Sequence, residues 1–191
     1  QIDSIPASGD KADLLFAGRL IKDKHVDMLI SSLALAKKEF PGISCFIIGE
    51  GPEKNRLLSL SKSLGLEDNL RFKGFMEYDG IIAQMKSARI FVFPSTREGF
   101  GMAALEAMAA WLPVITVEHP MNSSTELIKE GINGLICQPD PEDLCLKITS
   151  LLKNEEKLKR LSLGARDSTR GLSWESISGI TAGFYREALK R

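Results

Sequence analysis

Two cationic side chains follow the first apolar run of the sequence and could bind an anion. Gly18-Arg19-Leu20 closes the run 13–18, and Lys24 comes shortly after it. An arginine guanidinium offers a planar fork to a phosphate, whereas a lysine ammonium acts as a point charge. A helix that begins after this turn would add the positive end of its dipole. The pair therefore indicates either a phosphate site or two solvated loop cations.

A second chemically capable group lies in segment 97–106. Glu98 is followed by Gly99 and Gly101, which permit close backbone approach, and a helix that starts at Gly101 would present unpaired amide groups to an anion. Glu106 is surrounded in sequence by alanine, leucine and methionine. We expect it to have a partner, because burying an unpaired charge is costly. Ribose hydroxyls could be that partner, as could a neighbouring Lys or Arg; simple exposure on the helix face is the other alternative.

Glycines also follow the second apolar run, in the sequence Gly49-Glu50-Gly51-Pro52. A residue without a side chain lets a ligand come close to the backbone. An ordinary turn between a strand and a helix would have the same composition. The segment is therefore compatible with both a binding loop and a plain turn.

The elements that must position these groups alternate along the whole chain. Apolar runs predict strands at 13–18, 43–49, 70–75, 89–95, 113–118 and 134–138. Apolar residues at helical spacing predict helices at 25–40, 54–64, 78–88, 101–111 and 124–130, and again from 141 onward, including 174–190. We therefore predict an α/β, doubly wound Rossmann-like domain with a six-stranded parallel sheet covered on both faces. Such domains bind ligands beyond the carboxyl ends of the strands, where the groups above lie.

Composition excludes several classes of protein. The 191 residues are 43% hydrophobic and 26% charged, which is typical of a globular domain. Basic and acidic residues number 25 each, so no basic excess favours nucleic acid binding. No run approaches the roughly 20 apolar residues of a membrane span, and no signal peptide is evident. The three cysteines form no CxxC pair and there are only two histidines, so we expect no zinc site. Cys45 and Cys137 lie inside apolar runs, which predicts buried reduced thiols in a cytoplasmic protein.

Several common motifs are absent from the sequence. No G-x-G-x-x-G follows the first apolar run, and there is no G-x-x-x-x-G-K-[ST], so neither a dinucleotide fingerprint nor a P-loop is present. No D-x-D occurs that could hold a metal on a diphosphate. Arg19 and Lys24 could neutralise a diphosphate directly, so we expect neither a metal nor a cofactor.

Taken in order, these segments resemble the retaining glycosyltransferases of family 4, or group 1, which have the GT-B fold. Glu98 and Glu106 stand in the Glu-x7-Glu arrangement of that family, and the resemblance covers nearly the whole chain. A lone Glu-x7-Glu would mean little, whereas the ordered set at strand ends is specific. The matching segments are Gly18-Arg19-Leu20 with Lys24, Ile48-Gly49-Glu50-Gly51-Pro52, Phe93-Pro94-Ser95, Glu98-Gly99-Phe100-Gly101 continuing to Glu106, Pro113-Val114-Ile115, Asn133-Gly134-Leu135, and the terminal helix with Trp174 and Tyr185.

The resemblance implies a role for each matching residue. Arg19 and Lys24 would bind the donor diphosphate and stabilise it as it leaves, and Glu98 would face the donor sugar; these three would be catalytic. Glu106 would bind the ribose hydroxyls. The backbone at 100–102 would contact sugar and phosphate, and the backbone at 75–76 would contact the base. Besides Glu106, the implied donor-binding residues are Gly18, Glu50, Gly51, Phe75, Met76, Gly99, Phe100, Gly101, Met102 and Ala103.

Two positions depart from the family pattern. His25 stands where a glycine is common after the lysine. Segment 118–124 replaces a frequent Gly-Gly turn near the sugar pocket, which leaves the donor sugar open. His119 within it is either a sugar or phosphate contact or an ordinary loop residue.

The resemblance is to only the carboxyl-terminal domain of a two-domain enzyme. Segment 1–12 reads as the end of an interdomain linker, 13–172 as the nucleotide-sugar-binding domain, and 173–191 as a C-terminal helix. We expect the chain to bind a UDP- or GDP-linked hexose-type donor. It should transfer little sugar alone, because the missing domain would hold the acceptor, a glycan or lipid. The full enzyme could associate peripherally with a membrane.

Two other readings remain open. A natural single domain could sense nucleotide sugars or complete a partner subunit without catalysis. An α/β domain of another kind, such as a flavodoxin-like one, could match these motifs by chance, and it would have no affinity for nucleoside diphosphates.

Overall fold

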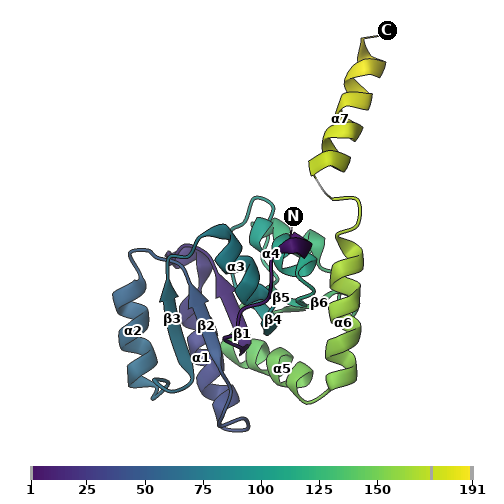
Figure 1. Ribbon diagram of the computed structural model, residues 1–191. Helices are drawn as coiled ribbons and strands as arrows, with labels where there is room; N and C mark the ends of the chain where they lie inside the picture. Colours follow the sequence, from purple (N-terminus) through teal and green to yellow (C-terminus); the bar gives the residue numbers. More distant parts are fainter. Residues whose placement is uncertain (1, 173, 190–191) are drawn as a thin grey trace.

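Six strands form one parallel sheet in the order β3-β2-β1-β4-β5-β6, which confirms the predicted architecture (Figure 1). The computed structural model describes residues 2–172 and 174–189. Lys190, where the predicted terminal helix ends, and residues 173 and 191, which bound the predicted C-terminal segment, lie outside the described residues. The strand order reverses between β1 and β4, which makes the edge beyond these two strands the switch point where α/β domains bind ligands. The strands are β1 Ala12–Ala17, β2 Cys45–Ile48, β3 Leu70–Gly74, β4 Ala88–Phe93, β5 Val114–Val117 and β6 Gly134–Cys137.

Helices cover both faces of the sheet. Helix α1 packs against α2 and α5, and helix α4 packs against α3 and α6, so two helical layers enclose the strands. Helix α7 extends away from the domain (Figure 1). The helices are α1 Val26–Lys37, α2 Lys54–Ser63, α3 Tyr78–Met85, α4 Met102–Ala109, α5 Pro141–Leu152, α6 Glu155–Ser168 and α7 Trp174–Ala188, with short 3-10 helices η1 Ile2–Ser4, η2 Lys22–Lys24 and η3 Ser123–Leu127.

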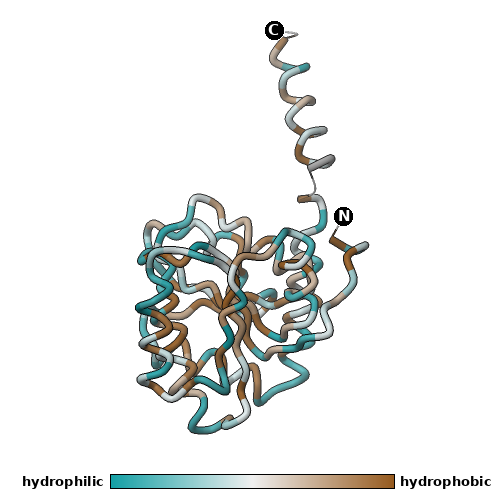
Figure 2. Tube along the Cα trace, turned by 60° about the vertical axis from the view of Figure 1, so that its left-hand side comes forward, coloured by the Kyte–Doolittle hydropathy of each residue, from teal (hydrophilic) through white to brown (hydrophobic). Residues whose placement is uncertain are grey.

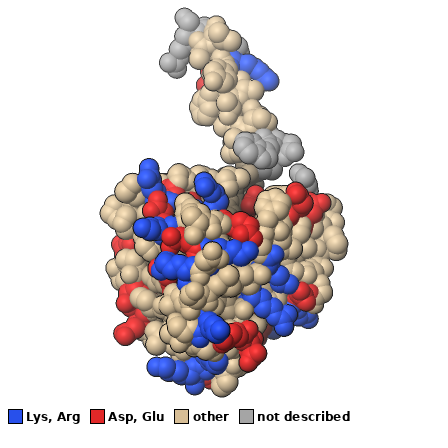
Figure 3. All heavy atoms as spheres, turned by 90° about the vertical axis from the view of Figure 1, so that its left-hand side faces the viewer, with Lys and Arg blue, Asp and Glu red and all other residues tan. Residues whose placement is uncertain are grey.

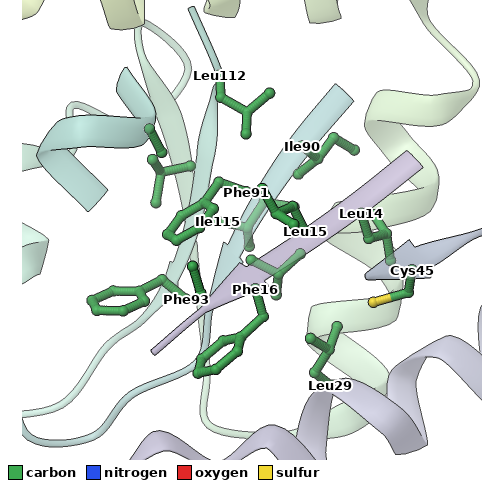
Figure 4. Packing of buried hydrophobic residues seen from close by; sticks show 14 of the residues in the cluster. Leu14, Leu15, Phe16, Leu29, Cys45, Ile90, Phe91, Phe93, Leu112 and Ile115 are labelled. Atoms are coloured by element: carbon green, nitrogen blue, oxygen red, sulfur yellow. The ribbon is translucent and has the colours of Figure 1, made fainter. Parts of the chain in front are cut away.

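The core combines strand residues buried within the sheet with the apolar faces of the helices that cover it. Leu15, Phe16 and Phe91 are fully buried on the central strands β1 and β4 (Figure 4). Figure 2 shows hydrophobic chain segments gathered in the centre of the domain and hydrophilic ones around them. This double burial explains why the strands read as continuous apolar runs in the sequence.

Most predicted helices end earlier than their sequence pattern indicates: the helix expected at 25–40 ends at Lys37, and the one expected at 78–88 ends at Met85. Local contacts explain where two others end. The helix expected at 101–111 ends at Ala109, because Trp111 adopts a left-handed φ of 67° and the Leu112 amide donates back to Ala107 O at 2.9 Å. The helix expected at 124–130 is only the 3-10 turn η3. Asn133 Oδ1 accepts from the Lys129 amide at 2.7 Å and so replaces a backbone bond that a longer helix would make.

Charges of both signs share one face of the domain, and two of the three cysteines are buried. On the face shown in Figure 3, Lys and Arg side chains alternate with Asp and Glu. Cys45 and Cys137 are buried, and burial raises the pKa of both thiols, that of Cys137 to about 12. None of the helices in the described part of the chain has the length and hydropathy needed to cross a bilayer.

Candidate functional site

The turns after β1 and β2 lie directly against each other at the carboxyl edge of the sheet. The Gly18 amide donates to Ile48 O at 3.0 Å, and the Leu20 amide donates to Glu50 O at 2.9 Å. Gly49 has a φ of 132°, and a Cβ there would lie 1.9 Å from Gly18 O. A Cβ on Gly51 would lie 2.3 Å from Leu20 O. These two glycines therefore permit backbone packing between the two turns, and this packing fixes where Arg19 stands.

Arg19 projects from this packed turn into solvent. It is exposed, and its side chain forms no ion pair or hydrogen bond within residues 2–172 and 174–189. A guanidinium with all its donors available can bind a phosphate bidentately. Of the two predicted phosphate ligands, Arg19 is the one whose charge is not already neutralised.

Lys24 is paired with Glu98. The Lys24 ammonium donates to Glu98 Oε1, and it also lies 5.2 Å from the centroid of the Phe93 ring. The two side chains are only 17% and 11% exposed. The family resemblance implies that Lys24 binds the phosphate and that Glu98 faces the sugar. In the structure these two side chains contact each other. Any ligand of one therefore meets the charge of the other.

His25, the residue after this lysine, contacts the loop that carries Glu98. It adopts a left-handed φ of 45°, a conformation that glycine adopts without strain. Its Nε2 lies 3.0 Å from Thr96 Oγ1, and the Thr96 amide donates to Asp23 O at 3.0 Å. The departure from the family pattern at this position thus adds a side-chain contact between η2 and the β4–α4 loop.

The amino terminus of α4 is the segment that the sequence predicts to bind an anion. Gly101 precedes it with a φ of 89°, and a Cβ there would lie 2.6 Å from Ser124 Cβ. Within the described chain the amides of Gly101, Met102 and Ala103 donate no hydrogen bond. Phe100 and Met102 are about half exposed beside them. Unpaired amides at a helix start favour negative charge, which supports the prediction for this segment.

The Glu106 carboxylate has no ion-pair or hydrogen-bond partner among the residues that the structure describes, so the alternative of a neighbouring Lys or Arg partner is not found there. Its side chain is half-buried, and desolvation raises its pKa. Burial also raises the pKa of Tyr78, with the charge of Glu106 as a smaller cause. Both residues line a groove of about 670 Å³ together with Met102 and Leu105. An acceptor oriented into a groove suits a ligand that brings hydroxyl donors.

The remaining predicted residues lie on the same edge of the sheet. Phe75 follows β3 and is 72% exposed, whereas Met76 is half-buried next to Gly80. Glu50 is exposed and pairs with Lys54 at 2.6 Å. Gly99 is exposed, with nothing near the position that a Cβ would occupy. All the predicted site residues thus follow the carboxyl ends of β1 to β4.

A buried polar cluster lies beside Glu98, and sequence reasoning gave its members no role, although two of them belong to segment 118–124. Asn122, Ser124 and Thr116 are almost fully buried and hydrogen-bond one another. The sequence signal was a run of turn-forming residues directly after a strand. His119, in the same loop, accepts from the Met121 amide through Nδ1 at 3.2 Å, which shapes the turn.

A family model described as glycosyl transferases group 1 matches residues 1–168. This chain belongs to the group 1 glycosyltransferases. It is 30% identical to a glycogen synthase of Mycobacterium tuberculosis over 179 residues, which are 93% of this chain and 43% of that protein. It is also 30% identical to a D-inositol 3-phosphate glycosyltransferase of Streptomyces bingchenggensis over 186 residues, 92% of this chain and 40% of that protein. The group 1 chain thus spans less than half the length of both relatives.

Solved glycosyltransferase structures share its fold. The pneumococcal O-GlcNAc transferase GtfA, solved in complex with UDP and GlcNAc, is 26% identical with a TM-score of 0.84, over 98% of this chain and 38% of that one. Anabaena Alr3699/HepE, solved with UDP and glucose, is 22% identical with a TM-score of 0.85, over 97% of this chain and 55% of that one. The group 1 domain is therefore a GT-B-type domain.

The arrangement presents cationic side chains and backbone amides that a negatively charged ligand could contact. Within residues 2–172 and 174–189, no three His, Cys, Asp or Glu side chains are grouped so that they could hold a metal ion. A guanidinium, an ammonium and a helix amino terminus together can bind a diphosphate. A half-buried carboxylate in the adjacent groove can accept from a diol.

Proposed function

We propose that this chain is the donor-binding domain of a retaining glycosyltransferase of family 4. The donor is a hexose-type sugar linked to UDP or GDP. The observation that carries the proposal is the convergence of Arg19, Lys24 and the unpaired amides of α4 on the switch-point edge, with Glu106 beside them. Structural neighbours solved with UDP, among them one 26% identical to this chain, support a nucleotide-linked donor.

In this proposal each group acts on a different part of the donor. Arg19 and the α4 amides bind the diphosphate and stabilise the charge that develops as it leaves. Glu106 accepts from the ribose hydroxyls, and the backbone at Phe75 and Met76 contacts the base. Glu98 faces the sugar. A carboxylate has about four acceptor sites, so Glu98 can accept from a sugar hydroxyl while Lys24 still donates to it. Lys24 has three N–H donors and can reach the phosphate at the same time.

Transfer itself requires an acceptor held in line with the sugar. Because the chain covers less than half of its relatives, we propose that a further domain supplies the acceptor site, for a glycan or a lipid. This chain alone then binds donor and transfers little sugar, and it needs no metal ion.

Calorimetric titration with UDP, GDP, UDP-glucose, UDP-GlcNAc and GDP-mannose, without metal, tests the proposal. Micromolar binding of one nucleotide class, lost in the Arg19→Ala/Lys24→Ala variant, is the expected result. Lys11→Ala is a suitable control, because Lys11 is an exposed cation that precedes β1 at the opposite edge of the sheet. Absence of binding to every ligand, or equal binding by the double variant, overturns the proposal.

A further inference from the structure

Asn122 is saturated with hydrogen bonds although it lies in a loop. Its Nδ2 donates to Thr116 Oγ1 at 3.1 Å and to Val117 O at 2.8 Å. Its Oδ1 accepts from the Ser124 amide at 3.2 Å and from Ser124 Oγ at 2.6 Å. The residue is 2% exposed. One side chain therefore joins the end of β5 to the start of η3 and fixes the loop between them.

The backbone of this loop holds Glu98. Glu98 and Asn122 form an isolated parallel bridge, in which the Glu98 amide donates to Met121 O at 2.9 Å and the Ser123 amide donates to Glu98 O at 3.1 Å. Ser124 also packs against Gly101 at the start of α4. The loop therefore contacts segment 98–101 at both of its ends.

The opposite side of the same segment is held by η2. Lys24 pairs with the Glu98 carboxylate, and His25 and Asp23 bond Thr96. The backbone of Glu98 is thus held by the loop that follows β5. Its carboxylate is held by Lys24, in the segment that follows β1. Arg19 and Glu106 lie on other segments, and among the described residues neither is hydrogen-bonded to Asn122.

We propose that Asn122 is a positioning residue for recognition of the donor sugar, acting through the backbone of Glu98. The inference rests on the proposed function, in which Glu98 faces that sugar. Loss of the Asn122 side chain leaves the buried Ser124 amide without its acceptor and removes one partner from each of the Thr116 and Ser124 hydroxyls, so the loop relaxes and the bridge to Glu98 weakens. Sugar binding then suffers more than diphosphate binding, because a hydrogen-bonding site discriminates only when its groups are held in place.

The test compares two dissociation constants in each protein, for the tightest-binding nucleotide sugar of the calorimetric screen and for its nucleoside diphosphate. In Asn122→Ala we expect the affinity for the nucleotide sugar to fall by about tenfold or more, and that for the diphosphate to change by less than about threefold. Thr116→Val keeps the shape of the core and removes one acceptor of the Asn122 amide, so it should show the same pattern with a smaller amplitude.

Asn69→Ala is the matched control for a purely structural effect. Asn69 is also a buried asparagine, which donates to Pro41 O at 3.0 Å and to Ile43 O at 2.7 Å, but it precedes β3 at the opposite edge of the sheet. It should lower the melting temperature without changing the ratio of the two constants.

The outcomes separate the two proposals. If the unaltered chain binds neither ligand, the proposed function fails, and the role of Asn122 fails with it. If it binds both ligands equally well, or if Asn122→Ala and Thr116→Val weaken both in the same proportion, the proposed function stands and the role of Asn122 is overturned.

Discussion

Replacing Glu98 by glutamine should strengthen the binding of the preferred nucleoside diphosphate. In the structure the Glu98 carboxylate neutralises Lys24, and both side chains are largely buried. A phosphate oxygen that contacts the same ammonium would lie roughly 5 Å from the carboxylate, about two hydrogen-bond lengths away. At an effective dielectric constant of about 20, two unit charges at that distance repel each other by about 3 kcal/mol.

Solvent and salt reduce this repulsion, so we expect a net gain of about 1.4 kcal/mol, which is roughly tenfold in Kd. The nucleotide sugar should gain less, because glutamine is a weaker acceptor for a sugar hydroxyl than a carboxylate. The variant should also be less stable, since the buried ammonium of Lys24 loses its counter-charge. Calorimetry at about 0.05 M and about 0.5 M salt, with a thermal melt of each protein, measures all three effects.

Glu155→Gln is the control, because it removes the same formal charge from a pair with Arg89 that is exposed and lies at the start of α6. Its diphosphate affinity should be unchanged at both salt concentrations. A folded Glu98→Gln protein that binds the diphosphate no better than the unaltered chain would refute the electrostatic reasoning. It would mean that the phosphate does not approach Lys24.

Three further outcomes test other features of the domain. Desolvation raises the pKa of Glu106, so its ionisation costs stability as pH rises from the ordinary Glu pKa through the raised one. Glu106→Gln should therefore increase the free energy of unfolding at neutral pH and change it little below about pH 4, as urea titrations at both pH values can show; equal effects at both would contradict this. Gly49→Ala should cost about 2 kcal/mol or more in chemical unfolding, because its Cβ would meet Gly18 O at 1.9 Å, whereas Gly9→Ala, with nothing within 4 Å, should cost little. In a Cys145→Ser chain, which lacks the partly exposed thiol on α5, the Cys137 thiol, with a pKa raised to about 12 by burial, should react with Ellman's reagent at pH 8 only after unfolding; rapid reaction of Cys137 in that folded chain would show that the β6 edge opens.

The order and identity of the elements were available from the sequence. Each strand is a short apolar run because it is buried on both faces, and each helix carries an apolar stripe because it covers one face. The alternation of the two implies a parallel sheet, and the ends of its strands locate the candidate site. Helix ends were less predictable, because Trp111 and Asn133 form hydrogen-bonded turns that local pattern does not show.

The composition of the site was also visible in the sequence, but its contacts were not. Residue types at the strand ends predict cations for a phosphate and carboxylates for hydroxyls. Only the tertiary structure shows that Lys24 and Glu98, which are 74 residues apart, form a pair, and that the Glu106 carboxylate has no partner within the described residues. It also shows that the glycines after β2 serve the packing of two turns and that Asn122 fixes the segment carrying Glu98. The physical reason is that periodicity reports burial, which each residue experiences separately, whereas a contact between loops depends on the order of the strands that bring those loops together.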